Sequence, residues 1–317
     1  MIGLPFLYTI AGGLFLGWSA LTLTDKSHPK RLGSAAFWGL LALSFLAGDY
    51  LTDLGNGILV LALVALAGTG QVSRGNPPTT TPAEREASAI THGNRLFLPA
   101  LIVPVTALIG TLGFKYLTFT GAPLVDARQV TLVSLALGVL IAIAVLMAWL
   151  RPPPLAPLHE GRRLVEAIGW AIVLPQMLAS LGAVFAIAGV GQVLGGIAGT
   201  VIPANSHFLA VLAFTLGMAG FTMIMGNAFA AFPVMMAAIG LPVLVFKLGG
   251  DPTIIAAIGM LSGFCGTLLT PMAANFNIVP AALLELDDRN AVIRAQVATA
   301  LPLLAINTLL IWALAFK

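Results

Sequence analysis

Apolar stretches of about twenty residues recur along this chain, and short polar segments separate them. Residues 129–150, for example, contain no charged side chain. A helix of about 20 apolar residues crosses the ~30 Å hydrocarbon core of a bilayer. Charged residues make up 9% of the chain, against roughly 25% in soluble domains, so it cannot cover itself with a hydrated surface. The sequence therefore predicts an all-α, polytopic membrane protein with about nine or ten transmembrane or re-entrant helices.

The lysines and arginines gather in or beside three of the polar segments. The residues concerned are Lys26, Lys30, Arg31, Arg74, Arg85, Arg95, Arg151, Arg162 and Arg163. These segments alternate with loops at 52–53 and 114–128 that are poorer in Lys and Arg. Such alternation is typical of membrane proteins whose basic loops are cytoplasmic. The net charge of +3 is therefore accounted for by the basic cytoplasmic loops. The expected partner is the lipid bilayer, and no nucleic-acid partner is expected.

The first half of the chain, residues 1–150, is predicted to be a five-helix membrane half. Its spans are expected at 2–23, 34–51, 54–72, 95–113 and 129–150. The segment 73–94 is rich in Pro and Thr and carries charges of both signs, so we expect a mobile cytoplasmic loop. Residues 151–163, RPPPLAPLHEGRR, are interpreted as a stiff basic cytoplasmic connector. The C-terminal membrane half is expected at 164–317.

The second half contains glycine and proline where a membrane helix would normally be uninterrupted. A span is predicted at about 164–188, followed by a glycine-rich segment, 190–202, that is too short to cross the bilayer. This segment is expected to lie at the interface or to re-enter the membrane. Pro233 and Pro242 divide residues 228–248 into pieces that fall well below the thickness of the bilayer core. A discontinuous or re-entrant helix is therefore expected at 228–248.

Two polar interruptions lie close together in this half. One is Gly226-Asn227-Ala228, and the other is GTLLTPMAANFN at 266–277. In hydrocarbon, backbone groups freed by a broken helix must be buried in protein or face a water-filled cavity. Short apolar segments interrupted by Gly and Pro are the best sequence indication of a transporter binding site. The interruptions therefore predict a solute site between residues 226 and 277.

The candidate solute-binding residues are Asn227, Thr267, Thr270, Asn275 and Asn277, with Gly226, Gly266 and Pro271 in supporting positions. Asn227 and Asn277 are each placed to cap the N-terminus of the following helix. Helix N-termini carry partial positive charge and attract anions, while amides and hydroxyls add neutral hydrogen bonds. These features favour a small anionic or zwitterionic solute. The alternative is that the amides hold helices together, as polar side chains in membranes often do.

The acidic residues and histidines indicate neither catalysis nor a metal site. None of the 12 Asp and Glu residues is clearly predicted to lie mid-span, whereas a proton-coupled transporter normally keeps a carboxylate or histidine there. A coupling ion, if there is one, is therefore expected to be Na+, held by carbonyls, hydroxyls and amides. His28, His92 and His159 fall in loops and are expected to be solvated. We expect no enzyme activity, because HxxH, His/Cys and GxSxG motifs are absent.

Two long blocks resemble a known family: GNAFAAFPVMMAAIGLPVL (226–244) and GMLSGFCGTLLTPMAANFNIVPAALLELDDRNAVIRAQ (259–296). They resemble bacterial permeases catalogued as a domain of unknown function, number nine-seven-nine, over the whole chain. The resemblance implies the architecture of the ion-transporter superfamily, whose members move organic anions through discontinuous helices. It implies a multi-pass protein of the bacterial cytoplasmic (inner) membrane. Genes of such families often lie near pyroglutamyl peptidase, which implies 5-oxoproline or a related carboxylate as the solute.

The first half departs from the superfamily pattern. A full transporter there uses two related halves, each with its own broken helix, and residues 1–150 show no comparable break. The resemblance therefore implies that a homodimer, or a smaller membrane partner protein, completes the transport unit. Two functions remain open: a secondary permease working by alternating access around residues 226–277, and a non-transporting scaffold or gating subunit of a two-component complex.

Overall fold

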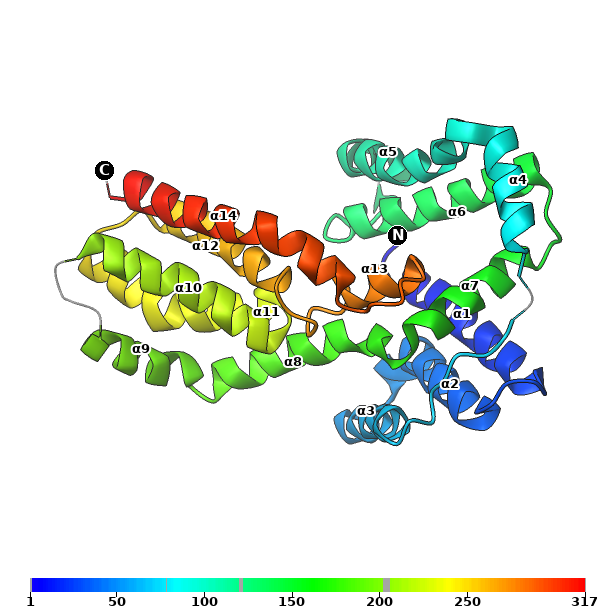
Figure 1. Ribbon diagram of the computed structural model, residues 1–317, viewed down its shortest axis with the longest axis horizontal. Helices are drawn as coiled ribbons and strands as arrows, with labels where there is room; N and C mark the ends of the chain where they lie inside the picture. The colour runs from blue at the N-terminus through cyan, green and yellow to red at the C-terminus, as the bar shows by residue number, and fades with distance from the viewer. Residues whose placement is uncertain (1, 78, 120–121, 202–205, 317) are drawn as a thin grey trace. The chain divides into compact units, whose positions relative to one another are not determined.

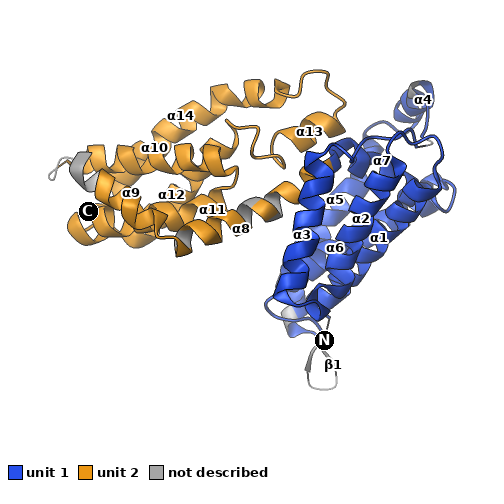
Figure 2. Cartoon of the chain, turned by 90° about the horizontal axis from the view of Figure 1, so that it is seen from below, with its two compact units in different colours: residues 1–169 blue, residues 170–317 orange. Residues whose placement is uncertain are grey.

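The computed structural model describes residues 2–77, 79–119, 122–201 and 206–316. The chain forms two compact units, residues 1–169 (unit 1) and residues 170–317 (unit 2), which are coloured separately in Figure 2. Both units consist almost entirely of helices (Figure 1).

Five apolar helices run alongside one another in unit 1 (Figure 2). They are α1 (Leu4–Thr24), α2 (Arg31–Ala47), α3 (Asp53–Gly68), α5 (Phe97–Gly113) and α6 (Val130–Leu150). Shorter elements connect them: η1 (Gly48–Tyr50), α4 (Pro82–His92), η2 (Gly93–Leu96), η3 (Phe114–Tyr116), the antiparallel strands β1 (Thr118–Phe119) and β2 (Ala122–Pro123), and α7 (Ala156–Ile168). The five apolar helices match the five spans predicted for this half.

Aromatic side chains fill the contact between α1 and α2. The ring of Phe15 stacks on Phe45 and Trp38, with ring centres 5.6 Å and 6.1 Å apart. Gly12 lets α2 approach closely, because a Cβ atom there would lie 2.5 Å from Cγ of Leu46. Small residues commonly allow such approach between membrane helices, and aromatic pairs add about 0.5–1.5 kcal/mol beyond the area they bury.

The basic loops lie together at the end of unit 1 that carries α4 and α7 (Figure 2). The Nζ of Lys30 donates to the carbonyl oxygen of Gly70 at 2.6 Å, and the hydroxyl of Thr79 donates to the carboxylate of Glu160 at 2.8 Å. The N-terminal residues pair with the segment after β2 at the opposite end. This arrangement agrees with the alternation of basic and less basic loops along the sequence.

Residues 82–92 form helix α4, so the mobile loop expected at 73–94 is wrong for this part. The hydroxyl of Thr81 accepts from the backbone N–H of Glu84 at 3.2 Å, and the Glu84 carboxylate accepts from the Thr81 N–H at 2.7 Å. This reciprocal pair is a capping box, and Pro82 stands at the first helical position, where its missing N–H costs nothing.

Helix α7 contains most of the connector expected at 151–163. The single span predicted at 164–188 is wrong, because α7 ends within it. Trp18 Nε1 donates to the carbonyl oxygen of Leu158 at 3.0 Å, which attaches α7 to α1. Gly169 adopts φ +63° and ends α7, and the next α-helix begins at Leu174 with 14 residues. Such a helix is about 21 Å long, so it is too short to cross the core by itself.

Unit 2 consists of a helical bundle and shorter helices beside it (Figure 1). Its elements are η4 (Gly169–Val173), which crosses the division between the units, α8 (Leu174–Ile187), α9 (Val190–Val201), α10 (His207–Met225), α11 (Ala228–Met235), η5 (Met236–Lys247), α12 (Pro252–Thr267), α13 (Ile278–Leu283) and α14 (Ala291–Leu314). The core lies between α10, η5 and α12, where Phe214, Met218, Leu244 and Ile255 are fully buried.

Residues 228–247 form one continuous helix, so the discontinuous or re-entrant helix expected for 228–248 is not observed. The helix is α-helical through α11 and becomes a π-helix in η5, with Pro233 in the first part and Pro242 in the second. A proline removes one N–H donor and clashes with the carbonyl group four residues earlier. The wider π-helical turn is one of the local adjustments that accommodate proline in membrane helices.

Helix α9 has 12 residues, which agrees with the short segment predicted at 190–202. It packs on α11 and η5 through glycines. A Cβ atom on Gly191 would lie 3.0 Å from the carbonyl oxygen of Val234, and one on Gly195 would lie 2.7 Å from that of Ala238. These contacts support small-residue helix packing as the reason for the glycines.

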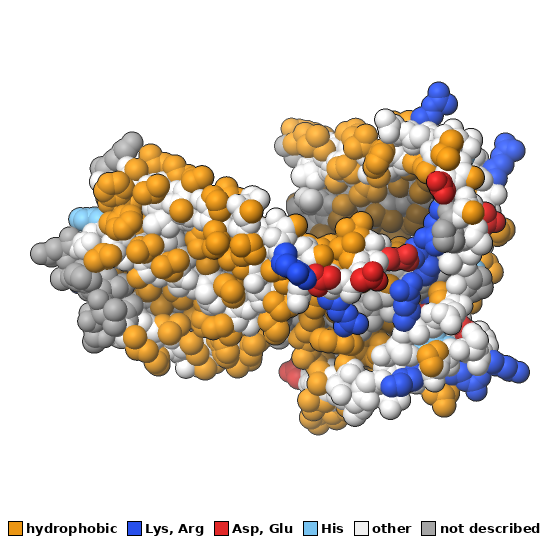
Figure 3. Space-filling view, viewed as in Figure 1, with side chains coloured by type: hydrophobic (Ala, Val, Ile, Leu, Met, Phe, Trp, Pro, Cys, Tyr) orange, Lys and Arg blue, Asp and Glu red, His pale blue; other side chains and the backbone are white. Residues whose placement is uncertain are grey.

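Seven helical stretches of the described residues are long and apolar enough to cross a membrane, and two apolar helices of 16 residues, α3 and α12, are shorter. Many of their large hydrophobic side chains are exposed, for example Leu61, Leu108 and Ile224. In Figure 3, hydrophobic side chains cover most of the visible faces of α5, α10 and α14. Lipid is the solvent that such a surface requires, so the chain is a multi-pass membrane protein.

Candidate functional site

The two polar interruptions of the second half meet at one end of unit 2. Helices α10 and α12 pack closely, and a Cβ atom on Gly266 would overlap the backbone carbonyl group of Ala219. The turn that follows α12 reaches the end of α10, where the hydroxyl of Thr270 donates to the carbonyl oxygen of Met223 at 2.9 Å. Residues 268–277 therefore lie against the helix end that leads into Gly226 and Asn227.

Gly226 and Asn227 form the sharp turn between α10 and α11. Gly226 ends α10 with φ +68°, a left-handed conformation that favours glycine. The side-chain oxygen of Asn227 then accepts from the backbone N–H of Phe229 at 2.9 Å. The N-cap predicted for Asn227 is confirmed. Because α10 has 19 residues and the helix at 228–247 has 20, this turn joins two helices that are each long enough to cross a membrane.

Asn277 is completely buried and braces the turn after α12. Its Nδ2 donates to the carbonyl oxygens of Thr267 and Thr270, at 2.8 Å and 2.7 Å. Both carbonyl groups lie outside the helical ladder of α12. Among the described residues the Thr267 carbonyl has no backbone donor, and the Thr270 carbonyl otherwise accepts only from the N–H of Ala273, at 3.4 Å. The amide therefore satisfies backbone acceptors that the end of α12 exposes.

The prediction that the Asn277 side chain caps the following helix is wrong. The residue precedes α13, but its side chain makes no capping bond there and points back to residues 267 and 270. Helix α13 has only six residues. Of the two helix N-termini that were expected to attract an anion, only the N-terminus of α11 therefore remains.

In α10 and the turn at 268–277, two buried side-chain oxygen atoms have no hydrogen-bond partner among the described residues. They are Oδ1 of Asn277 and Oγ1 of Thr222. Thr222 faces α12, since a Cβ atom on Gly263 would lie 3.3 Å from its hydroxyl oxygen. A buried polar atom without a partner costs about 1–3 kcal/mol, and sequence analysis did not identify Thr222.

The other predicted residues contribute less to this site. The hydroxyl of Thr267 donates to Phe264 of its own helix at 2.6 Å, so it is already occupied. Asn275 and Pro271 are exposed. The structure thus brings Thr267, Thr270 and Asn277 together next to the Asn227 turn, and it leaves Asn275 outside. No group of three His, Cys, Asp or Glu side chains suited to a metal ion occurs among the described residues.

A buried ionic cluster in unit 1 was missed by sequence analysis. Arg162 donates from Nε to Glu166 at 2.6 Å and from a terminal nitrogen to Asp25 at 2.7 Å. Glu166 also accepts from the hydroxyl of Thr22 and, at 3.0 Å, from the backbone N–H of Gly75. The cluster joins α1, the loop after α3 and α7. Its sequence signal was the i,i+4 spacing of Arg162 and Glu166 on an amphipathic helix.

His28 belongs to this cluster and is 5% exposed, so its expected solvation is wrong. Its Nε2 lies 3.8 Å from a carboxylate oxygen of Glu166, and its Nδ1 accepts from the backbone N–H of Lys30 at 3.1 Å. Hydrogen bonds from Ser27 and Arg162 lower the pKa of Asp25 to about 2. These contacts stabilise the carboxylates of Asp25 and Glu166 at the basic end of unit 1, where α1 and α7 meet.

Comparisons with known proteins give a family but no function. No curated protein and no solved structure matches the chain. A family model described as "Protein of unknown function (DUF979)" matches residues 5–316. The match agrees with the resemblance noted from residues 226–244 and 259–296. The chain therefore belongs to this family of unknown function.

Proposed function

We propose that the protein is a secondary permease for a small organic anion or zwitterion, such as 5-oxoproline or a related carboxylate. The proposal rests on one observation: the turns at 226–227 and 268–277 meet at the same end of α10 and α12. Non-helical backbone in a membrane helix bundle is tolerated where protein buries it or where it lines a watery cavity. In transporters such backbone commonly holds the solute.

The polar groups at these turns suit a solute that carries a carboxylate and a neutral or cationic donor. The first backbone N–H groups of α11, which Asn227 caps, carry partial positive charge that attracts a carboxylate. The hydroxyl of Thr222 can donate to the same group, because it has no partner among the residues that the structure describes. Oδ1 of Asn277 can accept from an amide N–H or an ammonium group, or coordinate Na+ as a coupling ion.

A scaffold or gating subunit is the second candidate, and one observation favours it. The side-chain amide nitrogen of Asn277 donates only to the turn itself, as a purely structural residue would. Met272 and Phe276 of this turn are exposed by 43% and 39%. The helices of a smaller membrane partner, or of a second copy of this chain, could pack on these side chains. Such an assembly is also compatible with the permease.

Solute uptake by proteoliposomes tests the permease. The full chain, alone and with its partner if one co-purifies, is reconstituted and given labelled small carboxylates, with a Na+ gradient and with K+ in its place. We expect saturable uptake of one solute. The same solute at 100 times its Kd should stabilise the purified protein by about 2.7 kcal/mol.

Two matched threonine variants test where the solute binds. Thr222→Val removes a hydroxyl that makes no hydrogen bond with the described residues. We therefore expect reduced uptake and a melting temperature that is unchanged or higher. Thr215→Val, on the same helix, removes a hydroxyl that lies 2.8 Å from that of Thr308, so we expect a lower melting temperature and normal uptake. Uptake that Thr222→Val leaves unchanged would exclude this site. Folded protein that transports and binds none of the solutes, with its partner present, would favour the scaffold.

A further inference from the structure

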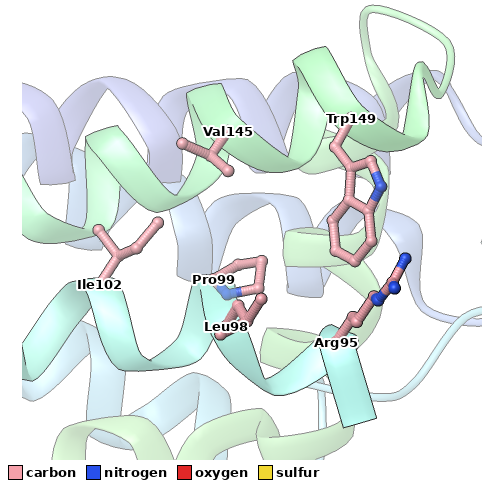
Figure 4. Close-up of a pocket in the computed structure, with 6 residues that line it drawn as sticks. All are labelled: Arg95, Leu98, Pro99, Ile102, Val145 and Trp149. Carbon is pink, nitrogen blue, oxygen red and sulfur yellow. The ribbon is translucent and has the colours of Figure 1, made fainter. Parts of the chain in front are cut away.

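An open groove in unit 1 lies between α5 and α6. It has a volume of about 510 Å³ and is lined by Arg95, Leu98, Pro99, Ile102, Val145 and Trp149. Figure 4 shows Arg95 and Trp149 pointing toward one another at one end, with Ile102 and Val145 toward the other. The groove is therefore amphipathic: one end is basic and aromatic, and the rest is aliphatic.

Arg95 is the one charged side chain among the described residues that line the groove. Its side chain is exposed, and no carboxylate lies within ion-pair distance of it in the described parts of the chain. Trp149 is held beside it by an edge-to-face contact with the ring of His92, whose centre is 5.3 Å away. The basic end of the groove thus presents an uncompensated positive charge next to an ordered indole ring.

The position of these residues along their helices indicates what occupies the groove. Arg95 precedes α5 by two residues, and Trp149 is the penultimate residue of α6, so both lie at helix ends. These ends belong to the part of unit 1 where the basic loops gather. Trp and Arg at such a level meet the lipid headgroups, while Leu98, Ile102 and Val145 run from there toward the apolar middle of the helices.

We propose that this groove binds a phospholipid with an anionic headgroup, such as phosphatidylglycerol. The guanidinium of Arg95 pairs with the phosphate, and donors of this kind hold phosphate oxygens in a bidentate manner. The indole of Trp149 lies at the level of the glycerol backbone. One acyl chain follows Leu98, Pro99, Ile102 and Val145. Basic pockets between membrane helices bind anionic headgroups by the same chemistry.

Quenching of Trp149 by brominated lipids tests the proposal. The full chain is reconstituted in phosphatidylcholine vesicles that contain increasing amounts of brominated phosphatidylglycerol or brominated phosphatidylcholine. Subtracting the emission of Trp149→Phe isolates the signal of this residue from that of the other four tryptophans. We expect phosphatidylglycerol to quench Trp149 at a lower mole fraction than phosphatidylcholine does.

Arg95→Gln should reduce this preference about fivefold, the usual effect of one basic residue near an anionic membrane. Arg128→Gln is the matched control, because it removes the same charge just before the opposite end of α6 and should leave the preference intact. Equal quenching by both lipids in the unmodified protein would overturn the proposal without any variant. A preference that Arg95→Gln leaves unchanged would also overturn it.

Discussion

The amide nitrogen of Asn277 lies 2.8 Å from the carbonyl oxygen of Thr267, ten residues earlier in the chain. A second bond from the same nitrogen reaches Thr270 at 2.7 Å. One buried side chain therefore satisfies the backbone on both sides of the point where α12 ends. The stability of this non-helical turn depends on that amide, whatever else the turn binds.

Asn277→Ala should lower the free energy of unfolding by about 1–3 kcal/mol, because it leaves the buried Thr267 carbonyl without a donor and the Thr270 carbonyl with only the 3.4 Å bond from Ala273. Thermal unfolding in detergent, followed by circular dichroism, measures the change. Asn275→Ala is the control two residues away: its side chain is exposed, so we expect a change within about 0.5 kcal/mol. Equal melting temperatures for the two variants would contradict the bracing role of Asn277.

Gly266→Ala should separate α10 from α12. The added Cβ atom would overlap the backbone of Ala219, which cannot move without shifting the whole helix. Forcing extra atoms into a packed contact costs about 1–3 kcal/mol, and the melting temperature should fall accordingly. Gly220→Ala, next to Ala219 in α10, places its Cβ in open space. That control should be neutral or should stabilise the helix by up to about 1 kcal/mol.

The helices of unit 1 were predictable because hydropathy and charge are local properties of the sequence. All five predicted spans overlap an observed helix, within a few residues at most ends. The loop prediction for 73–94 failed at α4 although TPAE at 81–84 carries the capping signal. The high content of proline and threonine in this segment is typical of a loop. The positions of Thr81 and Pro82 relative to Glu84, however, specify a helix N-terminus.

Unit 2 was harder to predict because its conformation depends on contacts between distant residues. Asn227 caps the next helix through a bond two residues away, so its role could be predicted. The direction of the Asn277 side chain depends on where the turn places the carbonyl groups of Thr267 and Thr270. Burial of His28 likewise depends on Glu166, far along the sequence. Neither relationship has a local signal.

Arg162→Met should destabilise unit 1 by about 3–5 kcal/mol, because it leaves the buried carboxylate of Glu166 without its cation. The double variant Arg162→Met with Glu166→Gln should recover much of this loss, since a neutral amide needs no cation and its oxygen can still accept from the Thr22 hydroxyl or the Gly75 N–H. Unfolding in detergent compares the three proteins. A double variant no more stable than the single one would mean that Arg162 acts mainly through Asp25.

Asp25 should make the stability of unit 1 depend on pH in the acid range. Hydrogen bonds from Ser27 and then from Arg162 lower its pKa in the folded protein from 3.8 to about 2. As the pH falls, Asp25 of the unfolded chain therefore binds a proton before Asp25 of the folded protein does. The stability that ionised Asp25 contributes is present above about pH 4 and is lost as the pH falls toward 2. Asp25→Asn should remove this part of the pH dependence.

Ser27→Ala provides the sharper test of the cause. Ser27 is exposed, and its hydroxyl oxygen lies 2.6 Å from the carboxylate of Asp25. Removing this donor should raise the folded-state pKa of Asp25 toward its ordinary value, so the stability lost between pH 4 and pH 2 should shrink. Melting temperatures of the parent protein and of both variants, measured between pH 2 and pH 6, give the comparison. If Ser27→Ala left the acid limb of the parent unchanged, the ion pair with Arg162 and the backbone N–H of residue 27, which the variant keeps, would hold the low pKa.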